Sequence, residues 1–251
     1  MLDTSSFGSL VTDSGPQGGA GNSPNVTGRS LLILVVARYR KLALVMLVTS
    51  PFFSVGLHAA NAQSQAENRA KCTDSNPDIG IAGCTADILS RSETVPSDLA
   101  IAYINRATAY GVKGRNDEAC SDAEKATHIA PSLAAAYDHR GVSCFYKKGN
   151  IDKAIADFSK AISLKPDFFP AYRNRCNAYY DKRMLDQALA DCSKAVSLRP
   201  DDAISYLSRG KVYGLQDLYE KAIADMTRAI ALDPNVQDGY FNRGMAYRLA
   251  G

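Results

Sequence analysis

Apolar and polar positions recur along residues 97–251 with a period of about 34 residues. Four evenly spaced prolines mark the period, namely Pro131, Pro166, Pro200 and Pro234. Tyrosine, arginine and small residues return in the same order in every period (Tyr103, Tyr137, Tyr172, Tyr206, Tyr240; Arg106, Arg140, Arg175, Arg209, Arg243; Ala107, Gly141, Cys176, Gly210, Gly244). A fixed period of this length predicts a solenoid, in which each unit buries its apolar face against its neighbours.

These units resemble tetratricopeptide repeats, in which each unit is a pair of antiparallel helices. The resemblance rests on Asn-Arg-Gly at 242–244 and on Ala-x-x-Leu-x-Pro at 195–200. On this resemblance the chain is identified as a member of the family, of the exported Gram-negative bacterial kind. It implies an all-α, right-handed superhelical solenoid of about four and a half repeats. The repeats would span residues 100–133, 134–168, 169–202, 203–236 and, in part, 237–251.

Residues 1–62 follow a different pattern, which predicts a disordered extension and then a secretory signal. Residues 1–30 are rich in Ser, Gly, Thr, Asn and Pro without an apolar period. A basic cluster then precedes an apolar run over 42–57, and the small residues Ala60 and Ala62 follow, as they do before a signal peptidase cut. The alternative is an uncleaved anchor within residues 31–60, because 42–60 is close to the ~20 residues that span a bilayer.

Residues 63–96 are expected to cap the first repeat. Residues 78–90 are predicted to form one amphipathic helix that resembles the second helix of a unit. Its apolar positions are Ile79, Ile81, Cys84, Ile88 and Leu89.

The arginine column departs from the family pattern, which usually has leucine there. An aspartate follows each of the first four arginines at a nearly constant separation along the chain, and two helices that fold back on each other bring such positions together. We therefore predict four buried or half-buried ion pairs that specify register more than stability (Arg106–Asp122, Arg140–Asp157, Arg175–Asp191, Arg209–Asp225). The alternative is that both columns are solvated. The second unit has one extra residue, within 144–149, which we expect in its first helix or in the following turn.

Composition and charge argue against several classes of function. The chain has 29 basic and 26 acidic residues, a net charge of +3, and removal of residues 1–62 leaves 25 and 24, a net charge of +1. Such a balance does not favour a nucleic-acid partner. Only three histidines occur, and catalytic and nucleotide-binding motifs are missing. We therefore expect no enzymatic activity and no cofactor.

The six cysteines all follow the proposed cut, and export to an oxidising compartment permits disulfides. Cys176 and Cys192 have the separation of the ion pairs, which predicts a bond across one hairpin. Cys72 and Cys84 flank the turn signal Asn76-Pro77 and are predicted to pair as well. Cys120 and Cys144 then remain on neighbouring helices, and their pairing stays open. The alternative for each is a buried thiol. A metal site is not expected, because no Cys-x-x-Cys or Cys-x-x-His spacing occurs.

The resemblance further implies that the concave surface, lined by the first helices, binds a peptide or a segment of another protein. The groove positions of the family fall on Ile101, Ile104, Thr108, Asp138, Val142, Phe145, Arg173, Asn177, Tyr180, Leu207, Lys211, Leu215, Phe241 and Met245. This mixture suits an apolar or mixed peptide, although some of these residues could instead pack between helices.

Two interpretations of the function remain open at this stage. The first is a non-enzymatic scaffold exported to the periplasm, and the second is a membrane-anchored assembly or regulatory subunit of a membrane complex. The last helix, 237–251, either caps the stack or associates with a second copy of the chain.

Overall fold

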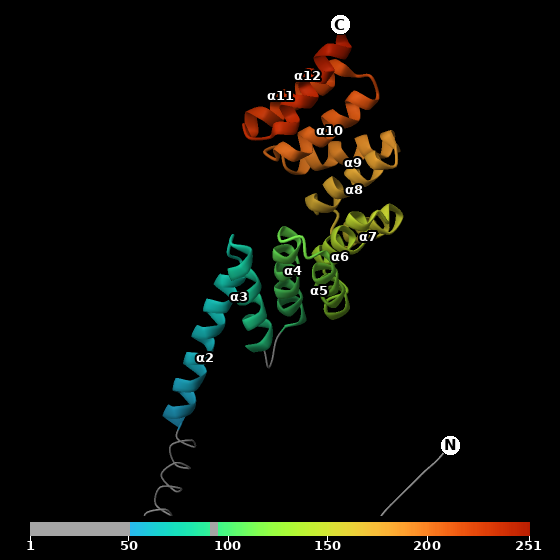
Figure 1. Ribbon diagram of the computed structural model, residues 1–251. Helices are drawn as coiled ribbons and strands as arrows, with labels where there is room; N and C mark the ends of the chain where they lie inside the picture. The colour runs from blue at the N-terminus through green and yellow to red at the C-terminus, as the bar shows by residue number, and fades with distance from the viewer. Residues whose placement is uncertain (1–50, 91–94) are drawn as a thin grey trace, which may run out of the picture. The chain divides into compact units, whose positions relative to one another are not determined.

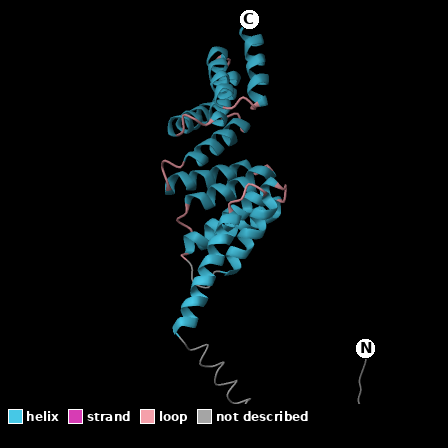
Figure 2. Ribbon diagram, turned by 90° about the vertical axis from the view of Figure 1, so that its left-hand side faces the viewer, coloured by secondary structure: helices cyan, strands magenta, loops and turns pink. Residues whose placement is uncertain are grey.

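The computed structural model describes residues 51–90 and 95–251, and in these ranges every regular element is a helix (Figure 2). The chain divides into two compact units, residues 1–59 and 60–251, and the second holds the repeats described below. The all-α fold predicted from the repeat pattern is confirmed. The predicted disordered extension, the basic cluster and most of the apolar run lie outside the described residues.

Four helical hairpins follow one another along the second unit (Figure 1). The first three are α4 (Pro96–Val112) with α5 (Asn116–Ile129), α6 (Ala134–Arg140) with α7 (Ile151–Leu164), and α8 (Phe169–Asp181) with α9 (Leu185–Leu198). The fourth is α10 (Ala203–Leu215) with α11 (Tyr219–Leu232), and α12 (Gln237–Ala250) then packs against α11. Each second helix also packs against the first helix of the next hairpin, which makes the stack a solenoid.

The extra residue of the second unit lies in its first helix, as expected. After α6 the backbone widens into a π-helical turn, η1 (Gly141–Phe145), and then tightens into a 3₁₀ turn, η2 (Tyr146–Lys148). The backbone N–H of Tyr146 bonds to the carbonyl of Gly141, five residues back, which is the bond that defines a π-helix. One residue is thereby added without breaking the helix.

Small residues hold the helices close together. Two alanine columns of the second helices are almost completely inaccessible to solvent (Ala119, Ala154, Ala188, Ala222; Ala126, Ala161, Ala195, Ala229). Larger side chains such as Phe158, Val212 and Met226 fill the space between neighbouring units. The core is therefore a row of small clusters along the stack rather than one central core.

The turn within each hairpin requires one residue in the left-handed region. Glycine supplies it in the first two units, at Gly114 (φ 70°) and Gly149 (φ 76°). In the next two units the same position is Arg183 (φ 60°) and Asp217 (φ 58°), which adopt this conformation at a cost.

Polar contacts at the turns fix how one unit stacks on the next. A cation at the end of a first helix reaches a carboxylate in the first turn of the preceding second helix (Lys113–Asp78, Lys148–Asp117, Lys182–Asp152). These contacts repeat at consecutive interfaces, so the register between units is the same along the stack.

The N-terminal segment forms a hairpin of its own, α2 (Pro51–Cys72) with α3 (Pro77–Ser90). Helix α3 packs against α4, and its role as a cap of the first repeat stays a prediction. Helix α2 was not anticipated, and it continues through residues 60–62, where the signal pattern places the cut. The two helices approach closely at Gly83, where an added Cβ would lie 2.5 Å from the Cβ of Lys71. In the part of the chain that the structure describes, no helix is long and apolar enough to cross a membrane.

Candidate functional site

The structure brings each of the four arginines to the aspartate that its spacing indicates. Every pair is bidentate, with Nε donating to Oδ2 at 2.6–2.7 Å and Nη2 to Oδ1 at 2.6–2.9 Å (Arg106–Asp122, Arg140–Asp157, Arg175–Asp191, Arg209–Asp225). The aspartates are buried and the arginines are half-buried. The hydrogen bond from the arginine to its aspartate raises the pKa of each arginine above its usual value. These charges are therefore used inside the hairpins and are not available to a ligand.

The remaining nitrogen of three of these arginines binds a hydroxyl of the preceding unit. Arg106 Nη1 donates to the hydroxyl of Thr85, Arg140 Nη1 to that of Thr127 and Arg175 Nη1 to that of Ser159. Sequence reasoning did not find this link, because the hydroxyl occupies different positions in different units. Each of these three arginines thus joins both helices of its own unit and the second helix before it.

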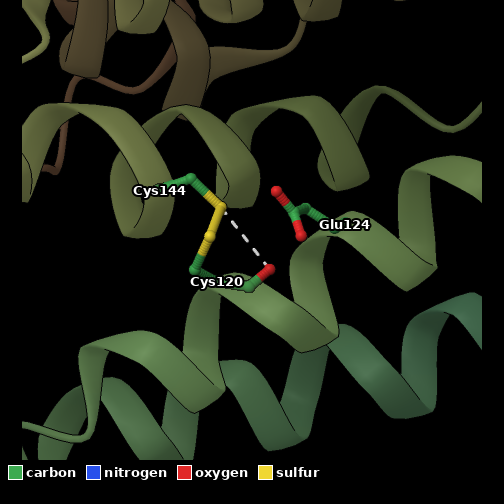
Figure 3. A group of neighbouring side chains, drawn as sticks. All are labelled: Cys120, Glu124 and Cys144. Carbon is green, nitrogen blue, oxygen red and sulfur yellow. Dashed lines mark hydrogen bonds between the residues drawn. A yellow bond between two sulfur atoms is a disulfide. The ribbon is translucent and has the colours of Figure 1, made fainter.

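All six cysteines are in disulfides in the structure. The Cys72–Cys84 and Cys176–Cys192 bonds each close one hairpin, with Cα atoms 4.3 Å and 5.3 Å apart. The Cys120–Cys144 bond, whose Cα atoms are 4.7 Å apart, joins α5 to η1 and thus the first unit to the second (Figure 3). The sequence alone leaves this third pair open.

The groove residues implied by the resemblance all lie on first helices but differ in accessibility. Ile104, Asp138 and Leu207 are buried, with exposed fractions of 5–6%. Phe145 packs toward α7, where Lys153 Nζ lies 5.7 Å from its ring, because the π-helical turn shifts it by one position. The others are half-buried or exposed (Ile101, Thr108, Val142, Arg173, Asn177, Tyr180, Lys211, Leu215, Phe241, Met245).

The charged groove residues are each held by a neighbouring unit. Arg173 Nη1 donates to Asp202 Oδ1 at 3.3 Å, and Lys211 Nζ lies 2.8 Å from Asp238 Oδ2. Asp138 accepts from Asn174 Nδ2 at 2.9 Å, yet burial raises the pKa of Asp138 to about 6. The groove therefore presents mainly apolar and aromatic groups to a ligand.

Five of the implied residues gather around one hollow at the C-terminal end of the groove. It has a volume of about 220 Å³ and is enclosed by α8, α10, α11 and α12. The five residues are Tyr180, Lys211, Leu215, Phe241 and Met245. Tyr219, Met226 and Leu249 also line the hollow. These three were missed from the sequence, because the family pattern counts only first helices and omits the position of Leu249. The sequence signal for this hollow is Gly214 in α10, because an added Cβ there would meet nothing within 4 Å. Gly210 also lines the hollow, but it allows close packing on α11, since its Cβ would lie 3.0 Å from Met226 Cε.

The implied residues of the first unit do not belong to this hollow. Ile101 lines a separate depression with Arg69 and Asp98, and Thr108 lines another beside Pro77 and Val112.

Helix α12 keeps several large side chains in contact with solvent. Tyr240, Phe241, Tyr247 and Leu249 are 47%, 70%, 58% and 54% exposed. Arg243 donates to Thr227 Oγ1 at 3.4 Å and its guanidinium lies over the ring of Tyr240. Phe241 is the most accessible of the four and stands at the rim of the hollow.

Two of three comparisons find similar proteins. Family models described as TPR repeat and tetratricopeptide repeat match residues 143–183, 169–202 and 203–236. Among solved structures, YrrB, described as a TPR protein with an unusual peptide-binding site, is 18% identical and covers 78% of this chain and 98% of its own, with a TM-score of 0.53. The MamA protein is 18% identical and covers 69% of this chain and 92% of its own, with a TM-score of 0.52. A comparison with curated protein sequences finds no match.

Proposed function

Because the chain is a tetratricopeptide repeat protein, with repeat models matching across residues 143–236, we propose that it is a non-enzymatic scaffold that binds a peptide or protein segment in the groove of its first helices. The observation that carries this proposal is the hollow between α10, α11 and α12. A solenoid fold by itself hosts many partners, so the argument depends on this site.

The lining of the hollow indicates the kind of segment that it accepts. Tyr180, Leu215, Phe241 and Met245 offer apolar and aromatic surface, while the ammonium group of Lys211 is engaged by Asp238. The volume of about 220 Å³ is below the ~300–1,000 Å³ of typical small-molecule sites. It suits one large apolar side chain of a peptide, which anchors the segment in the groove.

Binding of peptides selected against the folded full chain tests the proposal. Phe241→Ser removes an accessible aromatic side chain at the rim, and loss of such an anchor should weaken binding by about tenfold or more. Leu89→Ser is the matched control, because Leu89 is 80% exposed on α3, outside the hollow. Equal affinities of the Phe241 variant and the wild type for every selected peptide would contradict the proposal.

We also propose that the protein is exported and works in an oxidising compartment such as the periplasm. The three disulfides support this, because such bonds persist where thiols are not kept reduced. The signal pattern before Gln63 supports it independently.

The second candidate is the membrane-anchored subunit, and the fate of residues 42–60 separates the two. N-terminal sequencing of the mature protein should give Gln63 for the exported scaffold. A chain that retains residues 42–60 and sediments with membranes would establish the anchored form instead. Mature protein with six alkylatable thiols would contradict export in either form.

A further inference from the structure

The extra residue of the second unit lies between Arg140 and Phe145, in the segment that contains Cys144. In three other units a tyrosine lies four residues after the arginine, and its ring centroid is 5.8–5.9 Å from the guanidinium carbon of that arginine (Tyr110, Tyr179, Tyr213). In the second unit Phe145 takes this role, 6.0 Å from Arg140, although it lies five positions after the arginine. The π-helical turn therefore adds one residue before Phe145, which shifts Cys144 relative to the other units and leaves the rest of the unit in register.

The insertion places the Cys144 sulfur against the second helix of the first unit. There it meets Cys120 and, one helical turn further along α5, the carboxylate of Glu124 (Figure 3). The two sulfurs and a carboxylate oxygen all lie within 4.8 Å of one another. Cys144 is buried, Cys120 is half-buried and Glu124 is exposed, so solvent reaches the group at Glu124 and in part at Cys120.

This combination distinguishes Cys120–Cys144 from the other two disulfides. Those two close single hairpins and are at most 5% exposed at every cysteine, whereas this bond links two units and is partly accessible. Across residues 62–90 and 95–251, it is also the one place where three such ligand groups come together.

We propose that Cys120, Cys144 and Glu124 bind a zinc ion when this disulfide is reduced. Two thiolates and a carboxylate, with water as the fourth ligand, match the donors and the coordination number that zinc prefers. The usual spacing rules miss the site, because Cys120 and Glu124 share one helix face while Cys144 comes from another unit.

The chemistry of the exchange balances with a dithiol as the reductant. The dithiol transfers two electrons and two protons to the Cys120–Cys144 bond and becomes a disulfide itself. Zinc then displaces the two thiol protons into solvent. With Zn–S bonds of about 2.3 Å, tetrahedral geometry needs sulfurs about 3.8 Å apart. Cα atoms 4.7 Å apart allow this by rotation of the side chains.

Zinc would keep the first and second units joined after reduction. The oxidised protein holds α5 to η1 through the S–S bond, and the reduced protein would hold them through the metal.

Cobalt titration of the full chain tests the proposal. The protein is treated with a limiting amount of dithiol, alkylation mapping of a sample verifies reduction at Cys120 and Cys144, and the dithiol is removed. We expect one Co²⁺ per chain, with a thiolate-to-cobalt charge-transfer band that Zn²⁺ abolishes. The Cys120→Ser variant should show no such band.

The carboxylate is tested by Glu124→Gln, which should lower zinc affinity by about tenfold or more, since even outer-shell changes cost about that much. Glu118→Gln on the same helix is the matched control and should bind as the wild type does. Absence of the band from verified reduced protein, its persistence in Cys120→Ser, or equal affinities of the Glu124 and Glu118 variants would overturn the proposal.

Discussion

At the residue scale, the arginine–aspartate pairs are the polar centres of the hairpins. Arg209 and Asp225 illustrate them, with two hydrogen bonds of 2.7 and 2.8 Å and side-chain exposures of 19% and 9%. A pair so far from solvent adds little net stability, but either partner alone is costly. The pairs thus favour the native register of the two helices of a hairpin over alternative registers.

We predict that Asp225→Ala lowers the free energy of unfolding by about 3 kcal/mol, because it leaves the Arg209 guanidinium half-buried without a carboxylate. Urea unfolding measures the change. The exposed pair Arg115–Glu118 provides the control, since Glu118→Ala removes a pair that solvent screens and should lower the free energy of unfolding much less. Replacing both residues, Arg209→Met with Asp225→Leu, should restore most of the loss. Equal costs for the two single variants would show that burial does not matter here.

Asp138 and His139 are neighbours in α6 whose pKa values are shifted in opposite directions by burial. The pKa of Asp138 rises to about 6 and that of His139 falls to about 4. Between about pH 4 and 6 the folded state retains a proton on Asp138 that the unfolded state releases, so this residue makes unfolding easier as pH rises. His139 acts in the reverse sense, because the unfolded state holds its proton up to about pH 6.5.

We therefore predict that Asp138→Asn gains stability over the wild type as pH rises from about 4 to 7, by on the order of 1–2 kcal/mol. His139→Gln should gain over the wild type in the other direction, toward low pH. Urea unfolding at several pH values checks both. A difference between wild type and Asp138→Asn that does not change with pH would contradict the assignment.

The ion pairs could be predicted from the sequence because the hairpins are nearly equal in length. Two positions with a nearly constant separation along the chain then face each other across the two helices. The sequence could not predict the left-handed turn at Arg183 and Asp217, because neither residue favours that conformation as glycine does. It also could not separate buried from accessible groove positions. Leu207 and Lys211 share one helix, yet only the first is buried, among Met226 and Val236.

At the scale of elements, the helix of the second unit is irregular because it carries one more residue than its counterparts. The period located this residue to a few positions, but only the backbone shows that a π-helical turn absorbs it. For helix α2, by contrast, the sequence did not predict even that a helix exists. Its sequence resembles the end of a signal and a polar spacer, and the paired helix follows only from its contacts with α3.

We predict that deleting Cys144 in a Cys120→Ser background leaves the fold intact and changes the free energy of unfolding by no more than about 1 kcal/mol relative to Cys120→Ser with Cys144→Ser. The deletion puts Phe145 four residues after Arg140, the separation of Tyr179 from Arg175, so Phe145 keeps its place over the guanidinium while regular helix replaces the π-helical turn. Thermal unfolding and circular dichroism measure the effect.

Deletion of Ala178 in α8 is the control for that experiment. It turns the end of a regular helix by about 100° and should cost about 3 kcal/mol or more. If the two deletions were equally damaging, the extra residue would not lie between Arg140 and Phe145.

At the scale of the whole molecule, the row of separate clusters makes stability a local property. Within residues 95–251 each unit packs mainly against the units next to it, and the clusters around Phe158 and Met226 share no residue. In such a stack, disturbances at one end decay along it. The hollow at the C-terminal end can therefore change without altering the first units.

Hydrogen exchange followed by mass spectrometry checks this locality. We predict that Asp225→Ala speeds exchange of backbone amides in α10, α11 and α12, while α4 and α5 exchange as in the wild type. A uniform increase throughout the described helices would show that the stack unfolds as one cooperative unit instead.

The order of the disulfides along the chain has a consequence for biosynthesis. Each cysteine is joined to the next one in sequence, so the loops 72–84, 120–144 and 176–192 neither overlap nor enclose one another. A chain that emerges from its N-terminus into an oxidising compartment meets each correct partner before any wrong one. For a chain exported in this way, oxidation in order of emergence yields the native connectivity directly, so maturation would require a thiol oxidant and no exchange of disulfides.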